Sequence, residues 1–283
     1  MTGLVGDGTR IIPLDPRSTG PLTRRLEAAR NSYDEARRKM LEHDLARFYR
    51  VAIFGSARFT TDSTEFTFVT ELAKSLVESR NLDIVTGGGS GVMESAHFGV
   101  QQAIDGADAN GNIIRSRNHA TRIHLPFVEQ AQKDYAHIHT IHPEFSTRLQ
   151  EFLDKTRASY IAQGGIGTLL ELAMIIQAKQ VGHLENEYPI LAHPMWKPIV
   201  DAWNQEMYES RVANGKVPLI SEPDLNLIYF TNDIGEITMM ISQSYDIWRS
   251  TIRDRVRYVR TKPRNKARAG LNQSSSVQSS NLP

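Results

Sequence analysis

The chain has 283 residues, of which 40% are hydrophobic and 23% are charged, so it can bury one substantial core and lies outside the disordered, fibrous and membrane classes. It contains no cysteine, which excludes disulfides, thiolate metal sites and cysteine nucleophiles. The formal net charge of +1 gives no overall attraction to nucleic acid, and no run of residues predicts a membrane helix or a signal peptide. We therefore expect a soluble, cytoplasmic protein that binds neither membrane nor nucleic acid.

Two segments precede the part of the chain in which strands and helices alternate. Residues 1–20 carry Gly, Pro, Thr and Asp without a period, which predicts a flexible arm. Residues 21–49 have apolar side chains at spacings of three and four, which predicts one or two amphipathic helices. The arginines of this segment could bind anions, but the acidic residues among them favour a solvated, salt-bridged face. We interpret it as a packing or oligomer surface.

Residues 50–104 predict a βαβ unit followed by a further helix. The apolar run at 51–54 is typical of a buried strand, and residues 65–80 place apolar side chains on one stripe of a helix. The second strand is expected at 82–87 and the next helix at 92–104. Because two strands joined by a crossover helix run parallel with a right-handed connection, this unit predicts the start of a parallel sheet.

The loop after the first strand is a candidate ligand site. Ser56 could offer its hydroxyl and its backbone N–H to a ligand, and Arg58 could pair with a phosphate. The alternative is a plain turn with an exposed arginine. The residues of this loop alone leave both interpretations open.

Two glycine-rich turns each follow an apolar strand and open a helix. One runs from Thr86 to Glu94, and the other begins at Gly164 and opens a helix at Thr168. Free backbone N–H groups and the positive end of the helix dipole make such a turn an anion site, although one turn alone could be a simple strand-to-helix connection. Two such turns in one α/β pattern predict a nucleotide site, with the phosphate held by N–H groups and the Thr168 hydroxyl. The predicted substrate-binding residues in these turns are Gly88, Gly89, Ser90, Gly91, Glu94, Gly164, Gly165, Gly167 and Thr168.

Between the two glycine turns the sequence predicts a polar loop at 105–117, a strand at 122–127, and a strand around the histidines of 137–142. The spacing of these histidines resembles that of metal ligands, but no acidic or cysteine partner stands at a conventional distance along the chain. We interpret them as partly exposed strand residues and expect no metal. A helix at 145–157 then leads to a strand at 158–163. The side chains of this helix expected to point inward are Phe145, Leu149, Phe152 and Leu153.

The helix after the second glycine turn has a strongly apolar stripe and ends at Gly182, a typical C-cap. This stripe is more apolar than one face of a monomer's helix usually requires, so we expect a homodimer or a larger homo-oligomer. Residues 261–283 are basic and then Ser- and Gln-rich, which predicts a disordered tail. The other expected elements are a strand at 188–193, a helix at 197–208 with Pro198 in its first turn, a strand at 225–230 and a helix at 235–252.

This alternation predicts an α/β fold, a Rossmann-like, doubly wound parallel sheet with helices on both faces. The sequence contains no internal repeat and no second run of core residues. We therefore expect one nucleotide-binding domain over residues 50–252.

Four motifs, FGSAR, TGGGSGVMES, FSTR and QGGIGTLLE, occur in that order along the chain. The set resembles the LOG family of Rossmann-like proteins, long mislabelled as lysine decarboxylases, which are nucleoside 5′-monophosphate phosphoribohydrolases. The resemblance covers roughly residues 50–252. The family's signature PGGxGTxxE is matched, with Gln163 in place of the proline, by Gly164, Gly165, Gly167, Thr168 and Glu171.

The resemblance implies the catalytic residues. Arg148 stands where the family places an arginine ahead of its glycine loop, although Phe145 and Leu149 replace the methionine and lysine of that segment, and His97 stands where bacterial members usually carry asparagine. Glu171 would then orient the ribose hydroxyls and stabilise the ribosyl cation. Arg148 would bind the phosphate or the ribose edge and hold Glu171 ionised. The alternative is an ordinary helical glutamate and a surface arginine.

The expected activity is hydrolysis of the N-glycosidic bond of a nucleoside 5′-monophosphate, AMP or a cytokinin-type N6-modified AMP, to free base and ribose 5-phosphate, without a cofactor. The alternative is a non-catalytic nucleotide-binding or regulatory protein on the same fold, which would keep the glycines without needing both Arg148 and Glu171. Pyridoxal-phosphate chemistry fits less well, because no lysine lies beside either glycine turn. A dinucleotide dehydrogenase also fits poorly, since the first strand does not end in GxGxxG.

Overall fold

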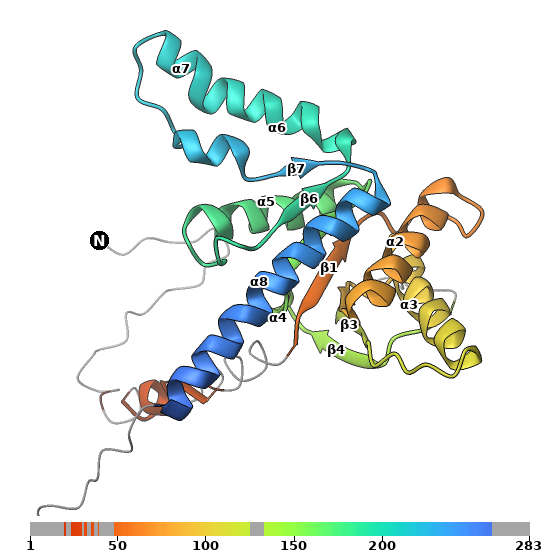
Figure 1. Ribbon diagram of the computed structural model, residues 1–283. Coiled ribbons are helices and arrows are strands. Elements are labelled where there is room, and N and C mark those ends of the chain that lie inside the picture. The colour runs from red at the N-terminus through yellow and green to blue at the C-terminus, as the bar shows by residue number, and fades with distance from the viewer. Residues whose placement is uncertain are drawn as a thin grey trace, which may run out of the picture.

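The computed structural model describes residues 48–124 and 133–261, together with scattered residues from 20 to 39 that are helical. Apart from Gly20 and Thr261, the predicted arm and the predicted tail lie outside the described residues. The sheet contains seven parallel strands in the order β4-β3-β2-β1-β5-β6-β7 (Figure 1). Because the order runs outward in both directions from the central pair β1 and β5, the sheet is doubly wound, as predicted. The strands are β1 (Arg50–Phe54), β2 (Asp83–Thr86), β3 (Asn118–Ile123), β4 (Ile138–His142), β5 (Ala158–Ile161), β6 (Ile190–Ala192) and β7 (Tyr229–Phe230).

Helices cover both faces of the sheet. On β1, Val51 and Ile53 join a core cluster with residues of α2, α3 and α8, whereas Ala52 and Phe54 join a second cluster with residues of α4 and α5. This division follows from the alternation of side chains along a strand. The predicted single α/β domain is therefore confirmed. The helices are α2 (Thr64–Arg80), α3 (Val92–Ala109), α4 (Phe145–Lys155), α5 (Ile166–Gln180), η1 (Pro194–Trp196), α6 (Lys197–Asn204), η2 (Gln205–Glu209), α7 (Ser210–Ala213), η3 (Glu222–Asn226) and α8 (Ile234–Thr261).

The third strand differs from the prediction of a strand at 122–127, because β3 begins four residues earlier, at Asn118. Its first residues are polar yet buried, and some of their side-chain atoms have partners inside the protein: the Asn118 amide donates to the backbone carbonyl of His97 at 2.9 Å, and Nε2 of His119 lies 3.3 Å from Asp83. Buried polar groups that find internal partners leave no apolar pattern in the sequence. The predicted polar loop at 105–117 also begins late, because α3 continues through Ala109.

Several predicted boundaries near the C-terminal end are also wrong. The strand expected at 225–230 is only β7, because a capping box between Ser221 and Asp224 starts the 3₁₀ turn η3. The helix α5 begins at Ile166, two residues before the predicted start, but it ends at Gly182 as predicted: Val181 is the C-cap, and Gly182 after it has a positive φ of 74°. The last helix, α8, continues beyond the predicted end at residue 252 to Thr261.

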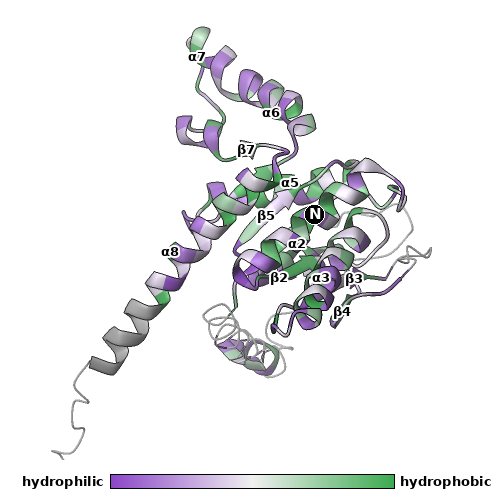
Figure 2. Cartoon of the chain, turned by 45° about the vertical axis from the view of Figure 1, so that its right-hand side comes forward, coloured by the Kyte–Doolittle hydropathy of each residue, from purple (hydrophilic) through white to green (hydrophobic). Residues whose placement is uncertain are grey.

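The helix predicted at 197–208 is longer and forms a projecting arm. The segments α6, η2 and α7 follow one another from residue 197 to 213, with π-helical geometry in η2, and none of them contains a buried residue. Both views of the chain show this arm extending away from the sheet (Figures 1 and 2). Ile199 and Trp203 on the arm are 47% and 57% exposed. Throughout the described part of the chain, every helix is too short or too polar to cross a membrane.

Candidate functional site

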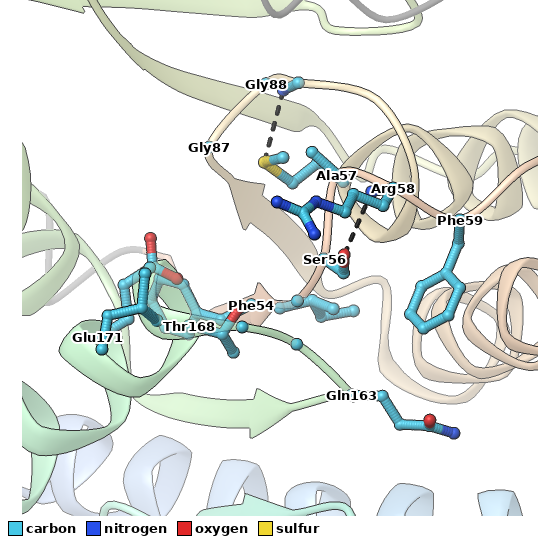
Figure 3. A pocket seen from close by; sticks show the side chains of 18 of the residues that line it. Phe54, Ser56, Ala57, Arg58, Phe59, Gly87, Gly88, Gln163, Thr168 and Glu171 are labelled. Carbon is cyan, nitrogen blue, oxygen red and sulfur yellow. Dashed lines mark hydrogen bonds between the residues drawn. The ribbon is translucent and has the colours of Figure 1, made fainter.

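An open cleft of about 790 Å³ lies at the carboxyl ends of the central strands. It is formed chiefly by the loops after β1, β2 and β5, at the point where the strand order reverses, which is where ligands bind in doubly wound sheets. Figure 3 shows the loop after β1 between the turn at Gly87 and Gly88 and the side chains of Thr168 and Glu171. Nine of the twelve predicted site residues line this cleft: Ser56, Gly88, Gly89, Arg148, Gly164, Gly165, Gly167, Thr168 and Glu171.

The turn before α5 is open toward the cleft. Gly165 is the N-cap of the helix, and no side chain caps it, so the first N–H groups of α5 have no acceptor within the helix. Thr168 is buried beneath the turn, and a Cβ atom on Gly164 would lie 2.2 Å from its hydroxyl oxygen. Glycine at position 164 is therefore required for the threonine to occupy this place. The result is a set of neutral donors at a helix N-terminus, which suits an anion.

Arg148 and Glu171 lie together at the wall of the cleft. The guanidinium Nη1 of Arg148 is 3.6 Å from Oε1 of Glu171, and its Nε donates to the backbone carbonyl of Thr121 at 2.9 Å. The same guanidinium lies over the ring of Phe152, 5.2 Å from its centroid. A Cβ atom on Gly87 would lie 2.2 Å from Nη2, so the glycine leaves the space that the arginine fills. The two predicted catalytic residues are thus brought together and held by two helices and a strand.

The environment of Glu171 differs from the prediction that Arg148 holds it fully ionised. Burial raises the pKa of the Glu171 carboxyl to about 7, and the neighbouring Arg148, which lowers the pKa, offsets only part of this effect. Near neutral pH the carboxyl therefore exchanges between its protonated and ionised forms. A carboxyl of this kind can give or take a proton at physiological pH.

In the turn before α3, several backbone N–H groups have acceptors within the protein. The N–H of Gly88 donates to the hydroxyl of Thr86 at 3.0 Å, and the N–H of Gly89 points at the sulfur of Met93 at 3.4 Å (Figure 3). The first N–H of α3, from Val92, donates to a backbone carbonyl of the loop after β1. Two of the donors predicted to hold phosphate, the N–H groups of Gly88 and Gly89, are therefore occupied within the protein.

The three predicted residues that do not line the cleft support this loop arrangement. Gly91 has a positive φ of 62°, and a Cβ atom there would lie 2.4 Å from the carbonyl oxygen of Ser56. Ser90 donates its hydroxyl to the backbone of the same neighbouring loop at 2.8 Å. Glu94 is buried and accepts the backbone N–H of Lys133 at 3.0 Å. All three connect chain segments beneath the cleft rather than face it.

The cleft also contains residues outside the predicted set. Arg122, at the end of β3, donates to the carbonyl of Gly88 at 3.2 Å and to Asp134 at 2.7 Å. Arg58 lines the cleft with an exposed side chain. Phe145, predicted to point inward, is instead 51% exposed and lines the cleft at the start of α4. An arginine at the carboxyl end of a parallel strand is a signal that could identify Arg122. The strand predicted at 122–127, however, puts Arg122 at its start instead of near its end.

The histidines of the β4 region have structural partners. His137 precedes the strand and accepts the backbone N–H of Asn118 through Nδ1 at 3.0 Å, whereas His142 contacts Glu151. His139 is exposed and lies 4.0 Å from Asp134. Within the described ranges, no three His, Asp or Glu side chains are grouped as metal ligands would be.

Comparison with known proteins gives only distant structural likenesses. No protein-family model and no curated protein matches the chain. The chain is similar to the molybdenum cofactor carrier protein of Chlamydomonas reinhardtii, with 16% identity over 71% of this chain and 99% of that one, at a TM-score of 0.46. It is similar to TM1055, with 15% identity over 69% and 99% of the two chains, at a TM-score of 0.47. The molybdenum cofactor binding protein of Rippkaea orientalis is 20% identical over 69% and 98%, at a TM-score of 0.41.

The fold and the cleft together define a class of protein. The chain is a Rossmann-like α/β protein with a seven-stranded parallel sheet and a cleft at its switch point. The open N-terminus of α5 and the Arg148–Glu171 pair distinguish one wall of that cleft.

Proposed function

We propose that the protein hydrolyses the N-glycosidic bond of a nucleoside 5′-monophosphate, giving the free base and ribose 5-phosphate. The observation that carries this proposal is the Arg148–Glu171 pair, which places a buried carboxyl of raised pKa one helical turn beyond an open anion site. The resemblance of the motifs to the LOG family supports the same reaction. AMP or an N6-modified AMP of the cytokinin type is the proposed substrate.

The reaction breaks the bond between C1′ of the ribose and a nitrogen of the base, and the bonding electrons leave with the base. The ribose then carries the positive charge of an oxocarbenium-like state, which a nearby carboxylate stabilises. Water adds to C1′, one of its protons is released, and the departing base nitrogen takes up a proton. In this proposal the ionised form of Glu171 orients the ribose hydroxyls and stabilises the cation, and Arg148 binds the phosphate or the ribose edge.

The phosphate is proposed to bind at the turn before α5. Gly165 and Gly167 line the cleft there, and the Thr168 hydroxyl lies beneath the turn. A dianion bound by neutral helix N-terminal donors requires neither a metal nor a cofactor. Arg58 and Arg122 add positive charge to the same cleft.

The test is chromatography of the products after the purified protein is incubated with each common nucleoside monophosphate. Expected are free base and ribose 5-phosphate in equal amounts, poor turnover of the corresponding unphosphorylated nucleosides, and full activity in EDTA. Loss of activity in EDTA that a divalent ion restores would contradict metal-free phosphate binding. Tight nucleotide binding with no product would instead support the second candidate.

That second candidate is a nucleotide-binding or regulatory protein without catalysis. The open α5 turn and the size of the cleft suit it as well as they suit an enzyme. Binding alone gives no reason for a buried carboxyl of raised pKa beside the arginine, which is why we place hydrolysis first.

We also propose that the protein is a homodimer or a larger homo-oligomer. Part of the α5 stripe belongs to the chain's own core, but Ile166 and Leu170 are 83% and 45% exposed beside the cleft. Met195, which lines the cleft, and Ile199 and Trp203 of the arm add to the exposed apolar surface of the chain. A second copy of the chain covering it would remove apolar side chains from water. Light scattering that shows only monomer at micromolar concentration would contradict this proposal.

A further inference from the structure

A second, smaller cavity lies between the start of α2 and the carboxyl end of β5, and we call it the β5 pocket. Tyr160 and Ala162 in its wall belong to the core cluster on the α2 side of the sheet. Its volume is about 230 Å³, below the roughly 300–1,000 Å³ of sites that take drug-sized ligands. The β5 pocket therefore suits a single ring system rather than a whole nucleotide.

The β5 pocket and the cleft meet at Gln163, which lines both. The loop after β1 fixes the backbone there, because the Gln163 carbonyl accepts the N–H of Ser56 at 3.0 Å. The Gln163 side chain points away from Thr168 and Glu171 (Figure 3). Its Nε2 lies 3.3 Å from Nε2 of His193, another residue of the β5 pocket. The two cavities are therefore neighbours that share one residue.

The two cavities differ in charge. Three arginines line the cleft, whereas the described residues that line the β5 pocket include no lysine or arginine. Glu65 is the acidic residue of the β5 pocket, and burial lowers the pKa of the His193 ring there, so the ring is neutral near pH 7. A phosphate in the β5 pocket would meet no cation from its lining. This lining therefore disfavours an anion and suits an uncharged ligand.

The wall of the β5 pocket contains a tyrosine whose hydroxyl has no partner. Tyr160 is fully buried, at 0% exposure, and within residues 48–124 and 133–261 its hydroxyl makes no hydrogen bond. A buried hydroxyl left in this way is costly, and most buried polar groups avoid it. The hydroxyl of Tyr188, another buried tyrosine, lies 3.0 Å from that of Thr156. A ligand with a donor or an acceptor would supply the partner that Tyr160 lacks.

The other side chains of the β5 pocket favour a flat ring that contains nitrogen. The amides of Gln163 and Asn232 can each donate and accept, and amide side chains pair in this way with the edge of adenine. Phe68, whose ring centroid is 6.1 Å from that of Tyr160, offers an aromatic surface on which a base can stack. The lining thus combines apolar surface for the faces of a ring with amides for its edge.

We propose that the β5 pocket is a second ligand site, which binds a free nucleobase such as adenine while the cleft binds the phosphorylated sugar. The inference rests on the proposed function in that hydrolysis releases both of these products. The base satisfies the Tyr160 hydroxyl and pairs with the amide of Gln163 at the boundary of the two cavities. The charged sugar phosphate stays in the cleft with the arginines.

The first measurement locates adenine by NMR of methyl groups in the full-length protein, which requires no catalysis. Val69 lines the β5 pocket, and Met93 lines the cleft. Addition of adenine should shift the methyl signals of Val69 and leave that of Met93 in place. A shift at Met93 without one at Val69 would overturn the proposal, as would the absence of any shift.

The second measurement compares the adenine affinity of Tyr160→Phe with that of the parent protein and of Tyr188→Phe, a matched loss of a buried hydroxyl. We expect Tyr160→Phe to bind adenine roughly fivefold more weakly, the scale of one hydrogen bond, and Tyr188→Phe to bind it like the parent. Thermal unfolding should show the opposite order. Tyr188→Phe loses its contact with Thr156 and should unfold at a lower temperature, whereas Tyr160→Phe loses no bond and should be at least as stable as the parent.

Equal adenine affinity in Tyr160→Phe and the parent would contradict the proposal. Adenine binding that follows the expected pattern without any hydrolysis of AMP would sink the proposed reaction and leave the β5 pocket standing. Hydrolysis of AMP by a protein that does not bind adenine would do the reverse.

Discussion

The two glycine-rich turns look alike in the sequence but have different roles in the structure. Before α3, the N–H groups of Gly88 and Gly89 have partners inside the protein, and Gly91 lets the loop after β1 approach closely. Before α5, no side chain caps the helix, and a Cβ atom on Gly165 or Gly167 would meet nothing within 4 Å. Glycine therefore serves close packing in the first turn, whereas the second turn is open, as the proposed phosphate site requires.

The residues that follow each turn extend this contrast. In α3, His97 is buried and contacts the hydroxyl of Thr86 at 3.1 Å, and its burial lowers the pKa of the ring to about 3, so the ring is neutral. In α5, Glu171 faces the cleft beside Arg148. The α3 turn belongs to a closed polar network of the fold, and the α5 turn opens onto a charged cleft. We infer that ligand chemistry is concentrated at the α5 turn.

The largest expected effect follows from changing the charged pair beside the α5 turn. Glu171→Gln or Arg148→Ala should lower hydrolysis of AMP by roughly 10²-fold or more, the usual scale for one preorganised electrostatic group. Circular dichroism should show an unchanged fold. As the control from the other turn, Ser90→Ala removes a hydroxyl that bonds the neighbouring loop, and its turnover should stay within a few-fold of the parent. Equal loss in all three variants would show that the two turns do not differ in this way.

The sequence predicts the sheet and the α5 side of the cleft better than it predicts the α3 side. Apolar strands predict buried positions directly, and the Gly164–Glu171 motif predicts residues that line the cleft, because few residue types fit these patterns. The roles of Gly88 and Glu94 depend on hydrogen-bond partners that the glycine spacing does not reveal. Gly88 donates to the hydroxyl of Thr86, and Glu94 accepts from Lys133, which is distant in the chain. Arg122 is not predicted as a cleft residue because the polar start of β3 does not look like a strand. The predicted strand is therefore too late in the chain, and Arg122 is not placed near its end. Spacing alone cannot tell an open turn from a satisfied one.

A second prediction concerns pH and Glu171. The folded pKa of about 7 lies above the ordinary value of 4.5, so between these values the folded protein binds more protons than the unfolded chain. The free energy of unfolding should therefore fall as pH rises through this window, by about 3 kcal/mol in total. Glu171→Gln lacks this dependence. Urea unfolding at pH 4 and pH 8 should show the variant gaining that amount relative to the parent, and a constant difference would refute the raised pKa.

The third prediction tests the packing role of the α3 turn. Gly91→Ala places a methyl group against the carbonyl oxygen of Ser56, at a positive φ that side chains disfavour. We expect a loss of about 2 kcal/mol in the free energy of unfolding, the scale of one strained backbone position. Denaturant titration measures this loss. An alanine tolerated without cost would mean that the loop after β1 does not need the close approach.

The smallest expected effect is at the α5 turn, where the same change should act in the opposite direction. In Gly167→Ala the added methyl group meets no protein atom within 4 Å, and alanine favours a helix over glycine, so the free energy of unfolding should rise by about 0.5 kcal/mol. The methyl group would nevertheless stand at the proposed phosphate site, where a ligand would approach the backbone. We therefore expect ribose 5-phosphate to bind several-fold more weakly to a slightly more stable protein, measured by calorimetry and by denaturant titration on the same sample. If binding is unchanged, the glycine at 167 is not there for ligand access, and the phosphate must be sought elsewhere in the cleft, beginning with Arg58 and Arg122.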